Sequence, residues 1–130
     1  MNPEVEIRPY RSEDQSQVVA LWKAVFPDDP PWNEPVSVIR RKLTVQPELF
    51  LVGLVNGRIV ATVVAGFEGV RGSIDHLAVH EEYRHKGIGT MLMRSAEQGL
   101  EELGCPKVNL QVRATNTAVT KFGVRSLILA

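Results

Sequence analysis

The sequence has 130 residues, of which 44% are hydrophobic and 23% are charged, a balance typical of one soluble globular domain. The 15 Lys and Arg residues balance 15 Asp and Glu residues, and this zero net charge argues against a broad nucleic-acid-binding surface. The single cysteine excludes an internal disulfide, and neither a signal-peptide pattern nor a bilayer-spanning run of about 20 apolar residues occurs. We therefore expect one domain over residues 1–130, cytoplasmic, with no nucleic-acid or membrane partner.

The N-terminal third predicts one strand and two helices. Residues 5–9 alternate as a short strand, and Ser12 is expected to cap a helix whose apolar side extends from Val18 to Phe26. A proline-rich loop at 27–35 ends that helix, and Asn33 is expected to cap a second helix. The outer, solvated face of the second helix is expected to carry a basic run, Arg40, Arg41 and Lys42.

Three strands are predicted next. Two apolar runs at 49–55 and 58–65 are joined by Asn56 and Gly57, and Asn-Gly between such runs indicates a two-residue type I′ hairpin. A glycine-containing turn then leads to a third strand at 74–80.

The third strand leads into a basic glycine loop at 84–89 and then into an amphipathic helix. Apolar residues spaced by three, four and seven positions form one face of that helix, and Gly104 marks its end. A further strand is predicted at 107–113, returning in parallel beside the strand at 74–80. The element order is β-α-α-β-β-β-α-β, which predicts an α/β fold with helices on both faces of the sheet.

The loop at 84–89 is suited to hold an anion. Its glycines let backbone N–H groups approach a ligand, the helix N-terminus adds unpaired donors, and Arg84, His85 and Lys86 add positive charge, although these side chains could equally be merely solvated. Two common phosphate-binding motifs are excluded. Leu92 stands where a G-x-G-x-x-G fingerprint needs glycine, and no G-x-x-x-x-G-K-[ST] string occurs.

The string RHKGIG at 84–89 fits the pattern Q/R-x-x-G-x-G/A, and the string LAVHEEYR at 77–84 is close to L-x-V-x-P-x-Y-[RQ], with Glu81 where proline is common. In these motifs and in its element order the sequence resembles the GNAT superfamily of N-acetyltransferases over about residues 5–122. The resemblance implies a GNAT-like, mixed and mostly antiparallel sheet flanked by helices.

The resemblance also implies that acetyl-CoA is the co-substrate and that no metal is used. In this family the backbone of the glycine loop receives the pyrophosphate, the main chain of the preceding strand pairs with the pantetheine arm, and an asparagine contacts the cofactor. The residues expected to bind acetyl-CoA are Leu77, Ala78, Val79, Arg84, His85, Lys86, Gly87, Ile88, Gly89, Thr90 and Asn116.

The catalytic residues are less clearly indicated. Acetyl transfer needs a base for the acceptor amine, and the branch of the family that acetylates protein N-termini has a glutamate in the string L-E-V-R, where this chain has Gln111. Asp75 and His76 are the remaining titratable candidates near the expected acetyl position, although each could instead be buried and paired or simply exposed. Strand alternation predicts that they point to opposite faces, so that at most one faces the site.

The C-terminal segment departs from the family pattern. Gly123 stands where family members have the tyrosine that acts as general acid, and the last strands are missing or altered, which suggests a truncation or frame change after Phe122. A missing final hairpin would expose a sheet edge. We therefore expect a homodimer or larger assembly, with residues 127–129 added as a strand to a neighbouring subunit.

These observations predict an acetyl-CoA-dependent N-acetyltransferase that acts on an amine of a small molecule or of a protein N-terminus. The alternative is an acetyl-CoA-binding or dimerisation module whose catalysis is impaired by Gln111 and Gly123.

Overall fold

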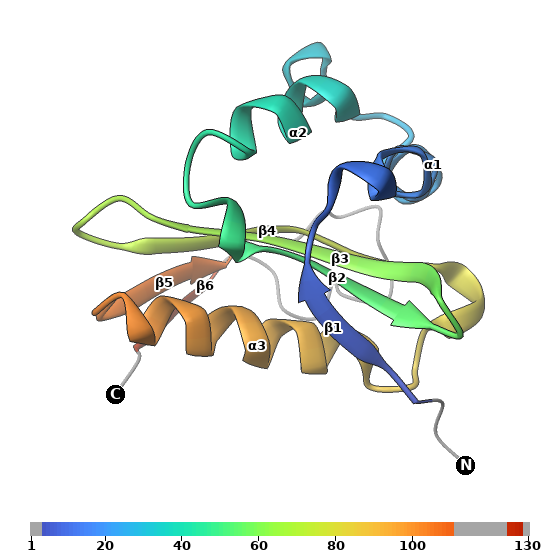
Figure 1. Cartoon of the computed structure of the whole chain (residues 1–130). Helices are drawn as coiled ribbons and strands as arrows, with labels where there is room; N and C mark the ends of the chain where they lie inside the picture. Colours follow the sequence, from blue (N-terminus) through green and yellow to red (C-terminus); the bar gives the residue numbers. More distant parts are fainter. Residues whose placement is uncertain (1–3, 111–124, 129–130) are drawn as a thin grey trace.

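The computed structural model describes residues 4–110 and 125–128, which form one six-stranded sheet between two layers of helices (Figure 1). Helices α1 and α2 cover one face of the sheet and α3 covers the other. The elements in chain order are β1 (Glu6–Pro9), α1 (Gln15–Val25), α2 (Pro35–Lys42), β2 (Phe50–Val55), β3 (Arg58–Phe67), β4 (Gly72–Val79), α3 (Ile88–Glu102), β5 (Lys107–Leu110) and β6 (Arg125–Ile128).

The sheet order is β1-β2-β3-β4-β5-β6, and every pairing is antiparallel except that of β4 with β5. Strand β5 runs parallel to the first part of β4, with Gly72 opposite Val108 and Ile74 opposite Leu110. Helix α3 makes the crossover between these two strands, as a parallel connection requires. The predicted fold class and the predicted strand, helix, strand unit are confirmed.

The last described strand, β6, corrects one expectation. Leu127 pairs with Val108 of β5 in the same chain, not with a neighbouring subunit, and Leu129 lies outside the described residues. Strand β5 would otherwise present a row of unpaired N–H and C=O groups, and the apolar C-terminal run satisfies them locally. The outer edges of the sheet are therefore β1 and β6.

The predicted hairpin turn is confirmed, whereas the two predicted helix caps are wrong. Asn56 and Gly57 both have left-handed backbone, with φ of 50° and 77°, as a type I′ turn requires. The predicted cap at Ser12 is wrong, because a 3-10 turn occupies Ser12–Asp14 and α1 begins only at Gln15. The cap of α2 is Glu34 and not Asn33: the Glu34 carboxylate accepts a hydrogen bond from the Ser37 N–H at 3.1 Å.

One apolar core lies on each face of the sheet. The core under α3 contains the buried face of that helix. The core under α1 and α2 contains the rings of Trp22 and Phe50, which stack with their centroids 5.7 Å apart. Cys105 belongs to the first core, where its thiol donates to the Lys107 carbonyl at 3.2 Å, so it serves as a small core residue. The fully buried residues of the α3 face are Ile88, Leu92, Ala96 and Leu100.

A partly buried ion pair connects β1 to the 3-10 turn that precedes α1. The Arg8 guanidinium donates to both carboxylate oxygens of Asp14, at 2.7 and 3.0 Å, and the Arg11 N–H donates to the same carboxylate at 2.8 Å. Burial alone would raise the pKa of Asp14, but these hydrogen bonds outweigh burial and hold the pKa below its ordinary value of 3.8. The carboxylate form of Asp14 therefore stabilises the folded state.

We expect the free energy of unfolding to fall as the pH drops below 3.8, because the Asp14 contribution is complete above the unfolded-state pKa and is lost as the pH falls through the lower folded-state pKa. Urea denaturation followed from about pH 6 to about pH 2 measures it. Asp14→Asn should remove this part of the pH dependence and cost about 2 kcal/mol at neutral pH, because the part-buried Arg8 loses hydrogen bonds to a charged partner. Asp28→Asn, at an exposed carboxylate, is the control, and an equal loss in both variants would contradict the assignment.

Candidate active site

The glycine loop connects the end of β4 to the N-terminus of α3. His85 and Gly87 both have left-handed backbone, with φ of 64° and 80°, and Gly87 is the N-cap residue of α3. Gly87 has no side chain to cap the helix, so the first N–H groups of α3, those of Ile88, Gly89 and Thr90, point out of the helix end. Such an end, with its positive dipole, favours an anion.

Gly89 is not required by the fold. A Cβ atom built on Gly89 would lie 3.5 Å from Cγ2 of Val79, an ordinary van der Waals distance, and its backbone is helical. Glycine in a helix is less stable than alanine, so this position keeps a residue that does not favour the helix. The packing of the fold therefore leaves room for a side chain at this position.

The predicted loop residues come together, but they differ in what they offer. His85, Lys86 and Thr90 are exposed, whereas the side chain of Ile88 lies in the core, so that only its backbone can contact a ligand. The Arg84 Nε–H donates to the carbonyl of Val79 at 3.1 Å, which ties the loop to the end of β4. Arg84 therefore has a structural contact in addition to its charge.

The predicted backbone segment lies in the second half of β4. The side chains of Leu77 and Val79 are buried in the core under α3, and Ala78 is buried in the core under α1 and α2. Among the described residues, β5 pairs with β4 along Gly72–Ile74, before this segment begins. The side chains of residues 77–79 are thus part of the two cores, and only their main chain can contact a ligand.

A β-bulge in β4 changes the geometry of the two catalytic candidates. Thr62 of β3 pairs with Ala78, and Val64 pairs with Asp75. Two residues of β4, His76 and Leu77, therefore lie opposite the one residue of β3 between them, Val63. His76 has φ of 50°, which turns its side chain away from the regular alternation. The expectation that Asp75 and His76 point to opposite faces is therefore wrong: His76 Nδ1 lies 2.9 Å from Asp75 Oδ1.

The two members of this pair have different environments. The His76 side chain is 8% exposed and lies against the rings of Trp22 and Phe26, with centroids 4.6 and 5.8 Å away, whereas the Asp75 side chain is 43% exposed. A carboxylate only accepts hydrogen bonds, so this contact favours a hydrogen on Nδ1 of the imidazole. His76 Nε2 is buried and has no hydrogen-bond partner among the described residues.

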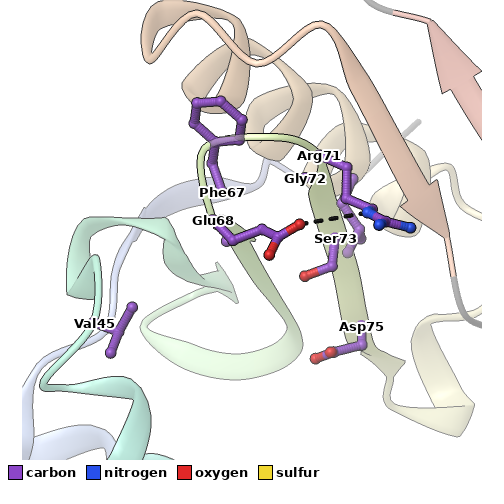
Figure 2. A pocket seen from close by; sticks show the side chains of 9 residues that line it. Val45, Phe67, Glu68, Arg71, Gly72, Ser73 and Asp75 are labelled. Carbon is purple, nitrogen blue, oxygen red and sulfur yellow. Dashed lines mark ion pairs between the residues drawn. The ribbon is translucent and has the colours of Figure 1, made fainter.

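Asp75 faces a pocket of about 480 Å³ between the α2–β2 connection and the β3–β4 hairpin (Figure 2). Ser73 and Asp75 are two positions apart in β4, so their side chains point to the same side of the sheet. Val45 lies across the pocket from them. An ion pair between Glu68 and Arg71, 3.4 Å long and largely exposed, lies at the hairpin end. The volume is within the range of small-molecule sites.

Lys42 lies beside this pocket and was not singled out by its sequence context. It is half-buried and donates to the carbonyl of Ala65, so it differs from the expected solvated basic face. Burial lowers the pKa of Lys42, and the carboxylates of Asp75 and Glu48 oppose that shift. The run of three basic residues in the sequence could not reveal this, because only the packing of α2 over β3 places one of them against the sheet.

One residue expected to bind acetyl-CoA, Asn116, lies outside the described part of the chain. The same is true of Gln111 and Gly123, which stand where the family pattern has its base and its acid. Within residues 4–110 and 125–128, no three His, Cys, Asp or Glu side chains come together as a metal site requires. No described helix has both the length and the apolar character needed to cross a membrane.

Comparison with known proteins agrees with the fold. The family model described as the acetyltransferase (GNAT) family matches residues 13–124. An acetyltransferase of Yersinia pestis (strain Pestoides F) is 44% identical over 115 residues, which are 88% of this chain and 81% of that protein.

Two solved structures show the same fold. Ard1 from Thermoplasma volcanium superposes with a TM-score of 0.75 at 24% identity, over 91% of this chain and 78% of that one. The PaiA N-acetyltransferase from Thermoplasma acidophilum, solved in complex with coenzyme A, superposes with a TM-score of 0.67 at 22% identity, over 92% and 86%. The family match and the 44% identity show that this chain belongs to the GNAT family of acetyltransferases.

Proposed function

We propose that the chain is a single cytoplasmic N-acetyltransferase domain that transfers an acetyl group from acetyl-CoA to an amine of a small molecule or of a protein N-terminus. The observation that carries the proposal is the uncapped N-terminus of α3, which opens directly after β4 behind the left-handed residues His85 and Gly87. The similar PaiA protein was solved with coenzyme A, which supports the same ligand here.

The residues at the end of β4 and in the loop fit this co-substrate. The outward N–H groups of residues 88–90 would hold the pyrophosphate, assisted by the positive charge of Arg84, His85 and Lys86. The main chain of residues 77–79 would pair with the pantetheine arm, and Asn116 would add a polar contact. Acetyl-CoA supplies the acetyl group as a thioester.

The acceptor side of the reaction is proposed for the pocket in front of Asp75. An amine must lose a proton before it can attack the thioester carbon. Asp75 is half exposed on the pocket wall and can hold the ammonium group and accept that proton, whereas His76 is buried behind it and orients the carboxylate. The apolar part of the acceptor would contact Val45 and Phe67.

The expected homodimer stays a prediction. Because β6 covers β5 within the chain, an assembly through the sheet edge would have to use β1 or β6.

Calorimetry with acetyl-CoA, followed by measurement of thiol release with a panel of primary amines, tests the proposed function. We expect saturable binding below about 1 mM, the upper range of common Michaelis constants, and thiol release with at least one amine. The absence of binding at that concentration would overturn the proposal. Binding without thiol release on any amine would favour the impaired module that Gln111 and Gly123 suggest.

A further inference from the structure

A buried chain of hydrogen bonds connects α1 to the bulge in β4. The Trp22 Nε1–H donates to Oγ1 of Thr62 at 2.8 Å, and the Thr62 hydroxyl donates to the main-chain carbonyl of His76 at 3.0 Å. All three residues are buried, and Thr62 is completely inaccessible. The one hydroxyl group therefore uses its donor and one acceptor position to join a helix side chain to the backbone of β4.

The bulge needs such a contact. A residue with a Cβ atom is disfavoured in the left-handed conformation that His76 adopts, so the surrounding structure must hold it there. A buried carbonyl that leaves the regular ladder also needs a hydrogen-bond donor. Thr62, one pair along the ladder from the bulge, supplies that donor.

The same helix also holds the imidazole. The ring of His76 lies against Trp22 and meets the edge of Phe26, and its Nδ1 contacts Asp75. The contacts thus continue from α1 through Thr62 and His76 to the carboxylate that faces the pocket. A change at Thr62 would alter the backbone of His76 and, through it, the direction of Asp75.

We infer that Thr62 is a positioning residue for acetyl transfer: its hydroxyl fixes the left-handed backbone of His76 so that the imidazole presents Nδ1 to Asp75. The inference rests on the proposed role of Asp75. Thr62 itself touches neither the acceptor nor the co-substrate. The competing explanation is that Thr62 only fills space in the core, and a side chain of the same shape without the hydroxyl separates the two.

The experiment compares Thr62→Val, which keeps the shape, with Thr62→Ser, which keeps the hydroxyl. We expect Thr62→Val to lower kcat by about tenfold or more, as loss of a supporting hydrogen bond commonly does, with the KM for acetyl-CoA within about twofold of the wild-type value. Thr62→Ser should recover most of kcat. Thr44→Val is the matched control, since it removes a hydroxyl that donates to the Arg41 carbonyl on the exposed surface.

A second measurement is independent of catalysis. Nitrogen NMR should show hydrogen on Nδ1 of His76 in the wild type and in Thr62→Ser, and a mixture of tautomers in Thr62→Val. If the wild type shows no acetyl transfer, the proposed function and the catalytic part of the inference both fail, whereas this readout still decides whether the Thr62 hydroxyl sets the contact between His76 and Asp75. Wild-type kcat or unchanged His76 nitrogen signals in a folded Thr62→Val would overturn the inference.

If Thr62→Val does not fold, Thr62→Ser and Thr62→Cys form the second comparison, because they differ in one atom and the thiol is a weak donor. The serine variant is then expected to exceed the cysteine variant in kcat and to keep the Nδ1 tautomer. Equal behaviour of the two would show that the hydroxyl does not position His76.

Discussion

Replacing Gly89 with glutamate is expected to weaken acetyl-CoA binding by about a hundredfold or more, close to 3 kcal/mol, while the protein becomes more stable. The new carboxylate would stand in the first turn of α3, where the pyrophosphate is proposed to bind, and like charges repel. The same carboxylate interacts favourably with the helix dipole, and a helical Gly has a lower propensity than Glu. Calorimetry with acetyl-CoA and a thermal melt measure the two opposite changes.

Gly89 is a cleaner test than Gly87. The backbone of Gly87 has φ of 80°, so any side chain there would strain the loop and confuse loss of fold with loss of binding, whereas a Cβ on Gly89 meets only an ordinary contact. Gln98→Glu is the matched control, because it adds the same charge to an exposed position of the same helix, far along from the loop. Unchanged affinity in Gly89→Glu would remove the loop from the binding site.

Asp75→Asn is expected to lower kcat by about a hundredfold to ten-thousandfold, the range that a positioned base contributes, without changing acetyl-CoA affinity. An amide cannot accept the proton of the acceptor amine, and the contact with His76 no longer holds a charge. Steady-state kinetics on the best amine of the panel, with calorimetry on the same preparations, measures the two quantities.

The pKa of Lys42 provides a second readout for this variant. The Asp75 carboxylate raises that pKa against the effect of burial, so Asp75→Asn should move it further below its ordinary value, as followed by NMR of the lysine side chain. Glu48→Gln removes the other carboxylate that acts on Lys42 and should shift the pKa in the same direction while kcat stays at the wild-type level. Full activity in Asp75→Asn would show that another group, or none, takes the proton.

Much of the fold could be predicted from short stretches of sequence. Asn56 and Gly57 adopt the left-handed turn that their types favour, and the apolar spacing after Gly87 becomes the buried face of α3. These features depend on backbone preference and on burial of one helix face, and both are properties of neighbouring residues. For the same reason the loop that precedes α3 could be located from its glycines.

The orientation of the two catalytic candidates could not be predicted in this way. Alternation places Asp75 and His76 on opposite faces, and it fails because the bulge inserts one extra residue into β4 opposite β3. The local sequence of β4 gives no signal that would predict the bulge. The carbonyl of His76 in the bulge accepts a hydrogen bond from Thr62. Thr62 in turn accepts one from Trp22, which is 40 positions away from it in the chain.

The sequence by itself determined the family, the order of most elements and the glycine loop that opens α3, because each depends on residues close together in the chain. Only the tertiary structure decided that Asp75 and not His76 faces the pocket beside β4, that Lys42 packs against the sheet, and that β6 pairs within its own chain. Those outcomes depend on contacts between distant segments, where packing and hydrogen bonding outweigh local preference.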